Sequence, residues 1–329
     1  MDRALLINCI PRAGDYLKRA LYAGPVSERE ILSGRISLAG LIPERGALCF
    51  DPDELTGEYD RIRLWLERSG ARFVPVDSEF YPPLLRYSRY APFALFAKGR
   101  DDVNWKRCLC AVGTRRPANA SRTEAYRFGL ECALNGVTLV SGYASGLDQD
   151  LMQGALDGGG QCVGIPGCGL DGITSPRALG MIGALCRQGS VMSPFLPDTP
   201  GYKSNYPKRN LILAACTPVV VAFQAPASSG VRITCNAALQ EGRDVVVHGS
   251  ALIWGDCRGT REIAEQGAPV VDGVRDLFTG AENRVRRLDY VPGSSPYPVV
   301  PDGAKLYRFR DAWYISGDEN ERGIQGSVS

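Results

Sequence analysis

Three glycine-containing turns, each placed after an apolar segment, carry the strongest sign of chemistry in the sequence. They cover residues 113–116, 141–148 and 167–171. Glycine at such positions lets backbone N–H groups approach a bound anion at the start of the next helix, where the helix dipole favours negative charge. One turn alone is weak evidence, because tight turns need glycine for conformational reasons. Three in succession along one sheet edge predict a common crevice, to which we assign Gly113, Thr114, Arg115, Arg116 and Gly142.

A second feature is the stretch at residues 202–210, in which basic and aromatic residues are interleaved. Cations hold phosphates and aromatic rings stack on unpaired bases, so this combination is typical of proteins that bind single-stranded nucleic acid. On its own, this stretch fits a solvated loop with ordinary charges equally well. Arg115 and Arg116, in the first turn, favour the interpretation as a site for an anionic ligand. The binding residues predicted here are Lys203, Tyr206, Lys208, Arg209 and Asn210.

A third feature is the turn at residues 225–230, which leads into a helical pattern. Ser228 or Ser229 can cap that helix, while Ser229 and Gly230 also offer N–H groups to a phosphate, and both interpretations remain open. Asp148 and Asp171 are interpreted as caps of helices or turns. A general acid–base pair would need a supporting histidine or metal motif, and none accompanies them.

Several classes of protein are excluded by motif. The first turn has one glycine before two arginines, which does not match the G-x-G-x-x-G dinucleotide fingerprint, and no G-x-x-x-x-G-K-[ST] segment occurs. The single histidine, His248, has no sequence neighbours that suit a nucleophile–base–acid constellation. The eleven cysteines include no C-x-x-C pair, so we expect buried free thiols and neither a metal site nor a cofactor.

The composition is that of an ordinary globular protein, with 44% hydrophobic and 22% charged residues. The net charge of +2 gives no overall signature for nucleic acid, so such binding must use a local basic cluster. No apolar run is long enough to span a membrane, and the N-terminus has no signal-peptide pattern. We therefore expect a cytoplasmic location.

The elements that must position these residues form an α/β pattern. From residue 107, apolar strands alternate with helices, which predicts an extended Rossmann-like domain with a parallel or mixed sheet covered on both faces. Ligands bind such sheets at the carboxyl ends of the strands. The predicted strands are Cys108–Val112, Val137–Ser141, Gln161–Ile165, Pro218–Phe223 and Asp244–His248, and the predicted helices are Asn119–Asn135, Asp148–Leu156, Arg177–Gln188, Tyr206–Cys216, Gly230–Glu241 and Thr260–Gln266.

Three regions follow from this pattern. Residues 1–70 are predicted to be a small helical domain, 71–280 the Rossmann-like domain, and 281–329 a C-terminal extension of unknown role. The expected N-terminal helices are Ala4–Tyr22, broken near Pro11, then Ser27–Leu38 and Pro52–Ser69, and Ala71–Val76 is an expected strand. The extension carries two weak strands at Lys305–Phe309 and Ala312–Ser316, and its last dozen residues are expected to fray.

These blocks, in this order, resemble the DprA/Smf family of DNA-processing proteins. The family's valine-glycine-serine-arginine turn corresponds to residues 112–115, and its Ser-Gly-x-Ala-x-Gly-Ile-Asp block to residues 141–148. Its Gly-Cys-Gly-Leu-Asp block is intact at residues 167–171. Further matches are the Tyr-Pro-Lys-Arg-Asn helix start at 206–210, Ser229 and Gly230 with Thr234, Gly267-Ala268, and upstream Tyr81-Pro82 with Leu84-Leu85.

The resemblance implies a domain that binds single-stranded DNA through a basic pocket. It also implies loading of a RecA-type recombinase onto that DNA, protection of incoming DNA in natural transformation, and homodimerisation. By motif match, Arg115, Lys203, Tyr206 and Arg209 would contact DNA, with Tyr206 stacking on a base where the family has phenylalanine. Residues 1–70 would correspond to the family's SAM-like helical domain.

The chain also departs from the family pattern. His248 replaces the usual proline before Gly249, Thr174-Ser175-Pro176 replaces an expected tyrosine-proline, and Arg261 replaces an asparagine. No helical counterpart of the C-terminal winged helix of many members is visible after residue 280. The alternative is a nucleotide-binding enzyme of the lysine-decarboxylase-like phosphoribohydrolase type, although its Pro-Gly-Gly-x-Gly-Thr-x-x-Glu loop is missing at residues 227–234. An adaptor that binds a small nucleotide or a partner protein is a third possibility.

Overall fold

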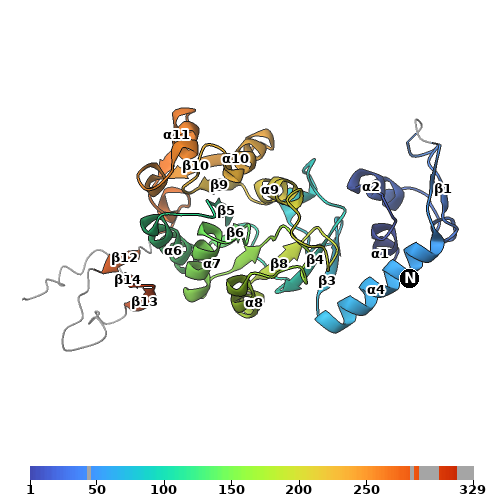
Figure 1. Cartoon of the computed structure of the whole chain (residues 1–329), viewed down its shortest axis with the longest axis horizontal. Coiled ribbons are helices and arrows are strands. Elements are labelled where there is room, and N and C mark those ends of the chain that lie inside the picture. The colour runs from blue at the N-terminus through green and yellow to red at the C-terminus, as the bar shows by residue number, and fades with distance from the viewer. Residues whose placement is uncertain (43–45, 282–284, 289–303, 317–329) are drawn as a thin grey trace, which may run out of the picture.

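The computed structural model describes residues 1–42, 46–281, 285–288 and 304–316, and its centre is one mixed sheet of nine strands (Figure 1). The neighbours from β11 to β8 run parallel, whereas β4 is antiparallel to β8 and β3 is antiparallel to β4. The strand order is β11 (Val270–Val271), β10 (Asp244–His248), β9 (Val219–Ala222), β5 (Cys108–Val112), β6 (Thr138–Ser141), β7 (Cys162–Gly164), β8 (Ser190–Ser193), β4 (Ala94–Gly99) and β3 (Arg72–Pro75). The predicted α/β class with a parallel or mixed sheet is confirmed.

Helices cover both faces of this sheet, as expected for strands that are apolar on both sides. In β5, Leu109 and Ala111 belong to one hydrophobic cluster, whereas Cys110 and Val112 belong to the other. The first cluster packs under α6 (Asn119–Leu134), α7 (Leu147–Asp157) and α8 (Pro176–Gln188), and the second under α5 (Pro83–Arg86), α9 (Asn205–Cys216) and α10 (Gly230–Gln240). Beyond β10 lie η1 (Gly249–Leu252), α11 (Arg258–Glu265) and η2 (Val274–Asp276).

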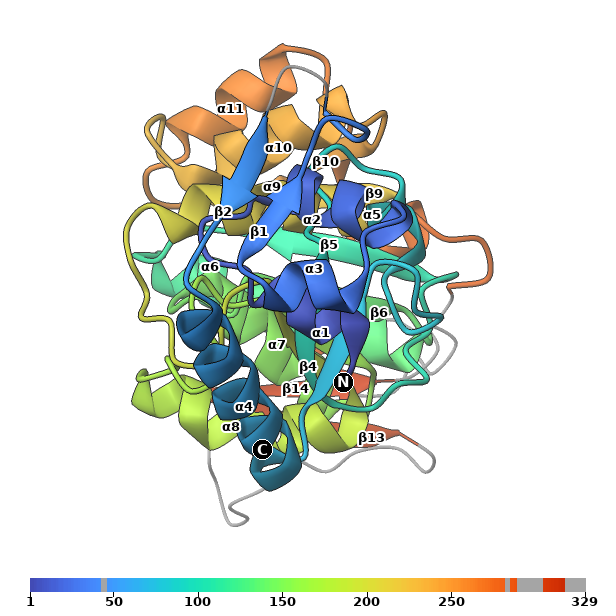
Figure 2. The same cartoon turned by 90° about the vertical axis from the view of Figure 1, so that its right-hand side faces the viewer.

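The N-terminal region combines helices with a small hairpin. Its elements are α1 (Arg3–Asn8), α2 (Asp15–Ala23), α3 (Glu28–Leu32), β1 (Arg35–Ser37), β2 (Ala47–Cys49) and α4 (Pro52–Ser69). The predicted helix Ser27–Leu38 was wrong beyond Leu32, because Gly34 adopts a left-handed φ of 70° and the chain turns there into β1, which pairs with β2. Figure 1 and Figure 2 together show α1 and α4 at the end of the large sheet where β3 and β4 lie, and α1 contacts β3.

A separate three-stranded sheet follows the large one. Its order is β12 (Val285–Leu288), β14 (Ala312–Ser316), β13 (Lys305–Phe309), with all neighbours antiparallel. The two predicted C-terminal strands have the bounds that the sequence indicated, while β12 was missed. The predicted fraying of the last dozen residues lies outside the described residues.

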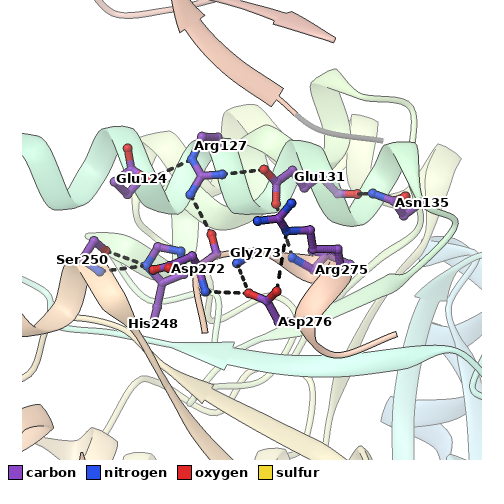
Figure 3. Close-up of polar contacts among 11 residues, drawn as sticks. Glu124, Arg127, Glu131, Asn135, His248, Ser250, Asp272, Gly273, Arg275 and Asp276 are labelled. Carbon is purple, nitrogen blue, oxygen red and sulfur yellow. Dashed lines mark hydrogen bonds and ion pairs between the residues drawn. The ribbon is translucent and has the colours of Figure 1, made fainter. Parts of the chain in front are cut away.

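A polar network attaches the segment before β12 to α6 (Figure 3). The guanidinium of Arg127 donates to Glu124, to Glu131 and to the carbonyl oxygen of Asp272. The Glu131 carboxylate accepts the backbone N–H of Val274 at 3.3 Å. This partly buried network fixes the turn at residues 272–276 on the helix that also carries the small sheet.

The expectation of free thiols is confirmed. All eleven cysteines are free, and all except Cys49 and Cys186 are buried. Across the described part of the chain, no helix combines the length and the apolar character that a membrane span requires.

Candidate functional site

A cleft with a volume of about 860 Å³ lies where four segments of the chain end or begin. The turns after β5 and β9 form two of its sides, and the starts of α9 and α10 form the others. It therefore opens at the carboxyl ends of parallel strands, where the sequence predicted a crevice. The cleft brings together nine of the predicted residues: Gly113, Thr114, Arg115, Arg116, Tyr206, Arg209, Asn210, Ser229 and Gly230.

Arg115 and Tyr206 form the central pair of this cleft. The Arg115 guanidinium carbon lies 4.1 Å from the centre of the Tyr206 ring, a cation–π contact. Gly167 lies close to the same ring, since a Cβ atom there would stand only 2.7 Å from a Tyr206 ring carbon. Gly167, in the third glycine turn, thus leaves room for the ring. Arg115, in the first glycine turn, contacts the face of the ring.

Arg209 lies beneath this pair and is only 4% exposed. Its Nη1 donates to the carbonyl oxygens of Gly142 and Ile165, the second at 2.7 Å. Burial lowers the pKa of Arg209 and raises that of the fully buried Asp148, and the attraction between the two charges opposes both shifts. Asp148 also accepts the N–H of Gly113 at 3.2 Å. A side chain at position 142 would collide with both charged groups, which explains the glycine there.

The opposite wall of the cleft is built on the N-terminus of α10. Ser229 is its cap, since its Oγ accepts the backbone N–H of Val231 at 3.2 Å, so the capping interpretation is confirmed. Gly230 is exposed beside it. Asn210 links this wall to α9: its Nδ2 donates to the Gly230 carbonyl at 3.2 Å, and its Oδ1 accepts from Arg209 Nε at 3.0 Å.

Sequence reasoning missed Gln224, which lines the cleft directly after β9. Its backbone carbonyl accepts the N–H of Thr114 at 2.9 Å, and its side-chain Oε1 accepts the N–H of Ala118 at 2.9 Å. Gln224 therefore holds the arginine-bearing turn in place. The sequence could have indicated Gln224, because this residue directly follows the predicted strand Pro218–Phe223 at the same sheet edge as the glycine turns.

The remaining predicted residues lie around the cleft. Gly142 lines a smaller cavity of about 260 Å³ that shares Arg115 and Tyr206 with the main one. Lys203 and Lys208 are exposed near the start of α9 and line neither of these two cavities. Over the described residues, no group of three or more His, Cys, Asp and Glu side chains is arranged to hold a metal ion.

The comparisons with known proteins agree with this architecture. The model of the family described as DNA recombination-mediator protein A matches residues 72–282, well over half of the chain. The chain belongs to this family. Protein Smf of Escherichia coli K12 is 30% identical over 234 residues, which are 71% of this chain and 63% of that protein's length. The chain therefore spans less than two thirds of the length of this relative.

Solved structures of the family show the same fold. DNA processing protein A from Streptococcus pneumoniae aligns with a TM-score of 0.67 at 24% identity, covering 84% of this chain and 97% of that one. DNA processing protein A from Helicobacter pylori, described for its single-stranded DNA binding mode, aligns with a TM-score of 0.56 at 24% identity, covering 63% and 93%. At this identity the two structures establish the fold of this family member.

Proposed function

We propose that this chain binds single-stranded DNA without sequence specificity, in the cleft that opens beside Arg115 and Tyr206. The observation that supports this most strongly is the cation–π pair itself, because it combines a phosphate-binding cation with an aromatic face in one cleft wall. The single-stranded DNA binding described for the H. pylori relative supports the same ligand.

Some of these residues would touch the DNA, and others would hold the DNA-contacting residues in position. Arg115 and Arg116 are exposed and would hold phosphates, while the half-buried Tyr206 ring would stack on a base. The backbone amide of Gly230, at the start of α10, would add a donor. The amides of Gly113 and Thr114 donate to Asp148 and to the Gln224 carbonyl, so these two residues would hold the first turn in place. Arg209 is buried and Asn210 is half-buried, and both are engaged with backbone and with each other, so we assign them a positioning role.

The exposed lysines would act outside the cleft. Lys203 and Lys208 flank the start of α9, where they would attract the DNA backbone electrostatically as it approaches Tyr206. Gly142 would contribute indirectly, by leaving space for the buried charges beneath the ring.

We further propose the wider role that the family resemblance implies. The chain would form a homodimer in the cytoplasm, protect incoming single strands in natural transformation, and load a RecA-type recombinase onto them. It would do this by binding and without catalysing a reaction. Light scattering of the purified chain tests the dimer, and recombinase filament formation on DNA with and without the chain tests the loading.

Replacing Arg115 with Ala tests the site directly. We expect about tenfold weaker binding of a labelled oligo-dT, because a phosphate contact and the support of the Tyr206 ring are both lost. The slope of log K against log salt should also shrink by about 0.7, the contribution of one phosphate contact to a single strand. Fluorescence anisotropy titrations at several salt concentrations measure both quantities.

Arg29→Ala is the matched control, because Arg29 is exposed in the N-terminal region and its loss changes the net charge equally. Wild-type protein that shows no affinity for the oligonucleotide at low salt would refute the proposal. Release of free base from a panel of nucleoside monophosphates would instead support the phosphoribohydrolase alternative.

A further inference from the structure

The small C-terminal sheet contacts the first residue of α6, directly after the residues that line the cleft. Ala118 lines the cleft, and the next residue, Asn119, begins α6. The side-chain Oδ1 of Asn119 accepts a hydrogen bond from Nη1 of Arg310 at 3.3 Å. Arg310 occupies the turn between β13 and β14, so this hairpin reaches the helix start that follows Arg115 and Arg116.

The hairpin is held against α6 by aromatic packing. The rings of Phe309 and Tyr126 are stacked, with centroids 4.2 Å apart and planes 8° apart. Tyr314 packs on the same Tyr126 ring at 5.2 Å, and the Tyr126 hydroxyl donates to Asp157 at 2.9 Å. This packing holds the hairpin turn beside the start of α6.

Basic side chains predominate on the surface of this sheet within the described ranges 285–288 and 304–316. The acidic residue in these ranges is Asp311, which is exposed in the same turn as Arg310. The exposed basic side chains are Arg286, Arg287, Lys305, Arg308 and Arg310. A basic surface beside an anion-binding cleft raises the local concentration of a polyanion.

The same sheet repeats the chemistry of the cleft. Arg308 lies opposite Trp313 on the neighbouring strand, and its guanidinium carbon is 5.4 Å from the centre of the indole ring. This is a second pairing of arginine with an aromatic ring, on a face of the sheet that lies away from the Phe309 and Tyr314 contacts with α6.

We propose that the β13–β14 hairpin extends the binding path of a single DNA strand beyond the cleft. This inference rests on the proposed function. The strand would leave the cleft past Arg116 and place its next phosphates against Arg310 and then Arg308. Arg310 uses one of its five N–H donors on Asn119, and the rest of its guanidinium can bind a phosphate.

The length of the oligonucleotide distinguishes the hairpin from the cleft. An oligo-dT of about 6 nucleotides fills one small site, whereas one of about 30 nucleotides can extend past it. In Arg308→Gln/Arg310→Gln we expect about tenfold weaker binding of the long oligonucleotide and a salt slope reduced by about 1.4. Binding of the short one should change less than about twofold, because it does not reach the hairpin. Arg29→Gln/Arg35→Gln removes two exposed charges from the N-terminal region and should leave both affinities unchanged.

The outcomes distinguish DNA binding in the cleft from the path of the DNA across the hairpin. Wild-type protein that binds neither oligonucleotide overturns the proposed function itself. Wild-type binding that the glutamine variant leaves unchanged at both lengths, or weakens equally at both, overturns only the path across the hairpin. Arg308→Lys/Arg310→Lys should keep most of the long-oligonucleotide affinity, and a loss equal to that of the glutamine variant would overturn the phosphate contacts. Circular dichroism of the wild type and the variants checks that the sheet is intact.

Discussion

His248 is held neutral by its surroundings. The imidazole stacks on Phe223, with centroids 4.5 Å apart, and meets Phe128 edge to face at 5.6 Å. Its Nδ1 lies 2.7 Å from the hydroxyl of Ser250 (Figure 3). Burial, assisted by the positive charge of Arg127, lowers the pKa of His248 to about 3, although Asp272 and Asp276 oppose the shift. His248, which stands where the family has a proline, therefore packs in the core as a neutral side chain.

This histidine should make stability depend on pH. The unfolded chain binds a proton at His248 below about pH 6.5, whereas the folded chain does so only near pH 3. The contribution of the neutral ring is therefore complete above pH 6.5 and is lost as the pH falls from there toward 3. Between about pH 7 and pH 5 we expect a loss of about 2 kcal/mol in the free energy of unfolding.

Urea unfolding of the wild type and of His248→Gln at both pH values measures this loss. The variant cannot take up the proton, so its stability should fall less over the same interval. Equal losses in the two proteins would show that His248 does not titrate differently on unfolding.

At the residue scale, the sequence predicted which residues line the cleft better than it predicted which of them are buried. Three local patterns placed residues that line the cleft: a glycine turn placed Arg115, a basic and aromatic stretch placed Tyr206, and a helix-cap pattern placed Ser229. The burial of Arg209 was not predictable, because it depends on carbonyl oxygens of Gly142 and Ile165 that are remote in sequence. A basic residue in a motif does not reveal whether it faces a ligand or the protein interior.

The crossing of α6 and α7 depends on two glycines. A Cβ atom at Gly129 would collide with the carbonyl oxygen of Leu151, and one at Gly154 with that of Tyr126. The two helices therefore approach through their backbones. Because α6 and α7 both begin at the cleft edge, their close packing also fixes the two turns that precede them.

Gly129→Ala should consequently destabilise the protein by about 3 kcal/mol, since a rigid backbone crossing cannot accommodate the added methyl group. Gly57→Ala is the matched control. Gly57 lies exposed within α4, and an added methyl group there would meet no atom within 4 Å, so alanine should stabilise the helix by about 0.5–1 kcal/mol. Chemical denaturation of both variants measures the two opposite shifts, and a neutral Gly129→Ala would contradict the close crossing.

At the element scale, the long periodic segments were predictable and the short ones were not. The bounds of α4, β5 and β10 match the predictions, because capping residues and apolar runs mark their ends. The strand β8 was missed, since its four residues begin and end with serine and lie directly after a helix. It is a strand because it pairs with β7 and β4, which local sequence does not encode.

The N-terminal region is joined to the large sheet by both packing and polar contacts. Residues of α1 and α4 share a hydrophobic cluster with Phe93 and Phe96. Trp65 of α4 packs edge to face on Phe96 and donates to Asp171 at 2.6 Å, in the third glycine turn. Whether residues 1–70 form a separate domain stays a prediction, but this continuity argues for joint unfolding.

We therefore expect one cooperative transition for the N-terminal region and the sheet. Urea unfolding followed by circular dichroism and by tryptophan fluorescence should give coincident midpoints. Trp65→Phe serves as the comparison, because it removes the reporter on α4. A fluorescence transition at lower urea that disappears in Trp65→Phe would show instead that α4 detaches first.

The position of β3 at one end of the large sheet has a consequence for handling the protein. An outermost strand presents unpaired backbone groups that can recruit a strand from another molecule. Here α1 lies against β3, and α1 and α4 occupy that end of the molecule (Figure 2). We therefore expect α1 and α4 to shield β3 from other molecules, and we expect shortened versions that begin at the family match to form insoluble assemblies more readily.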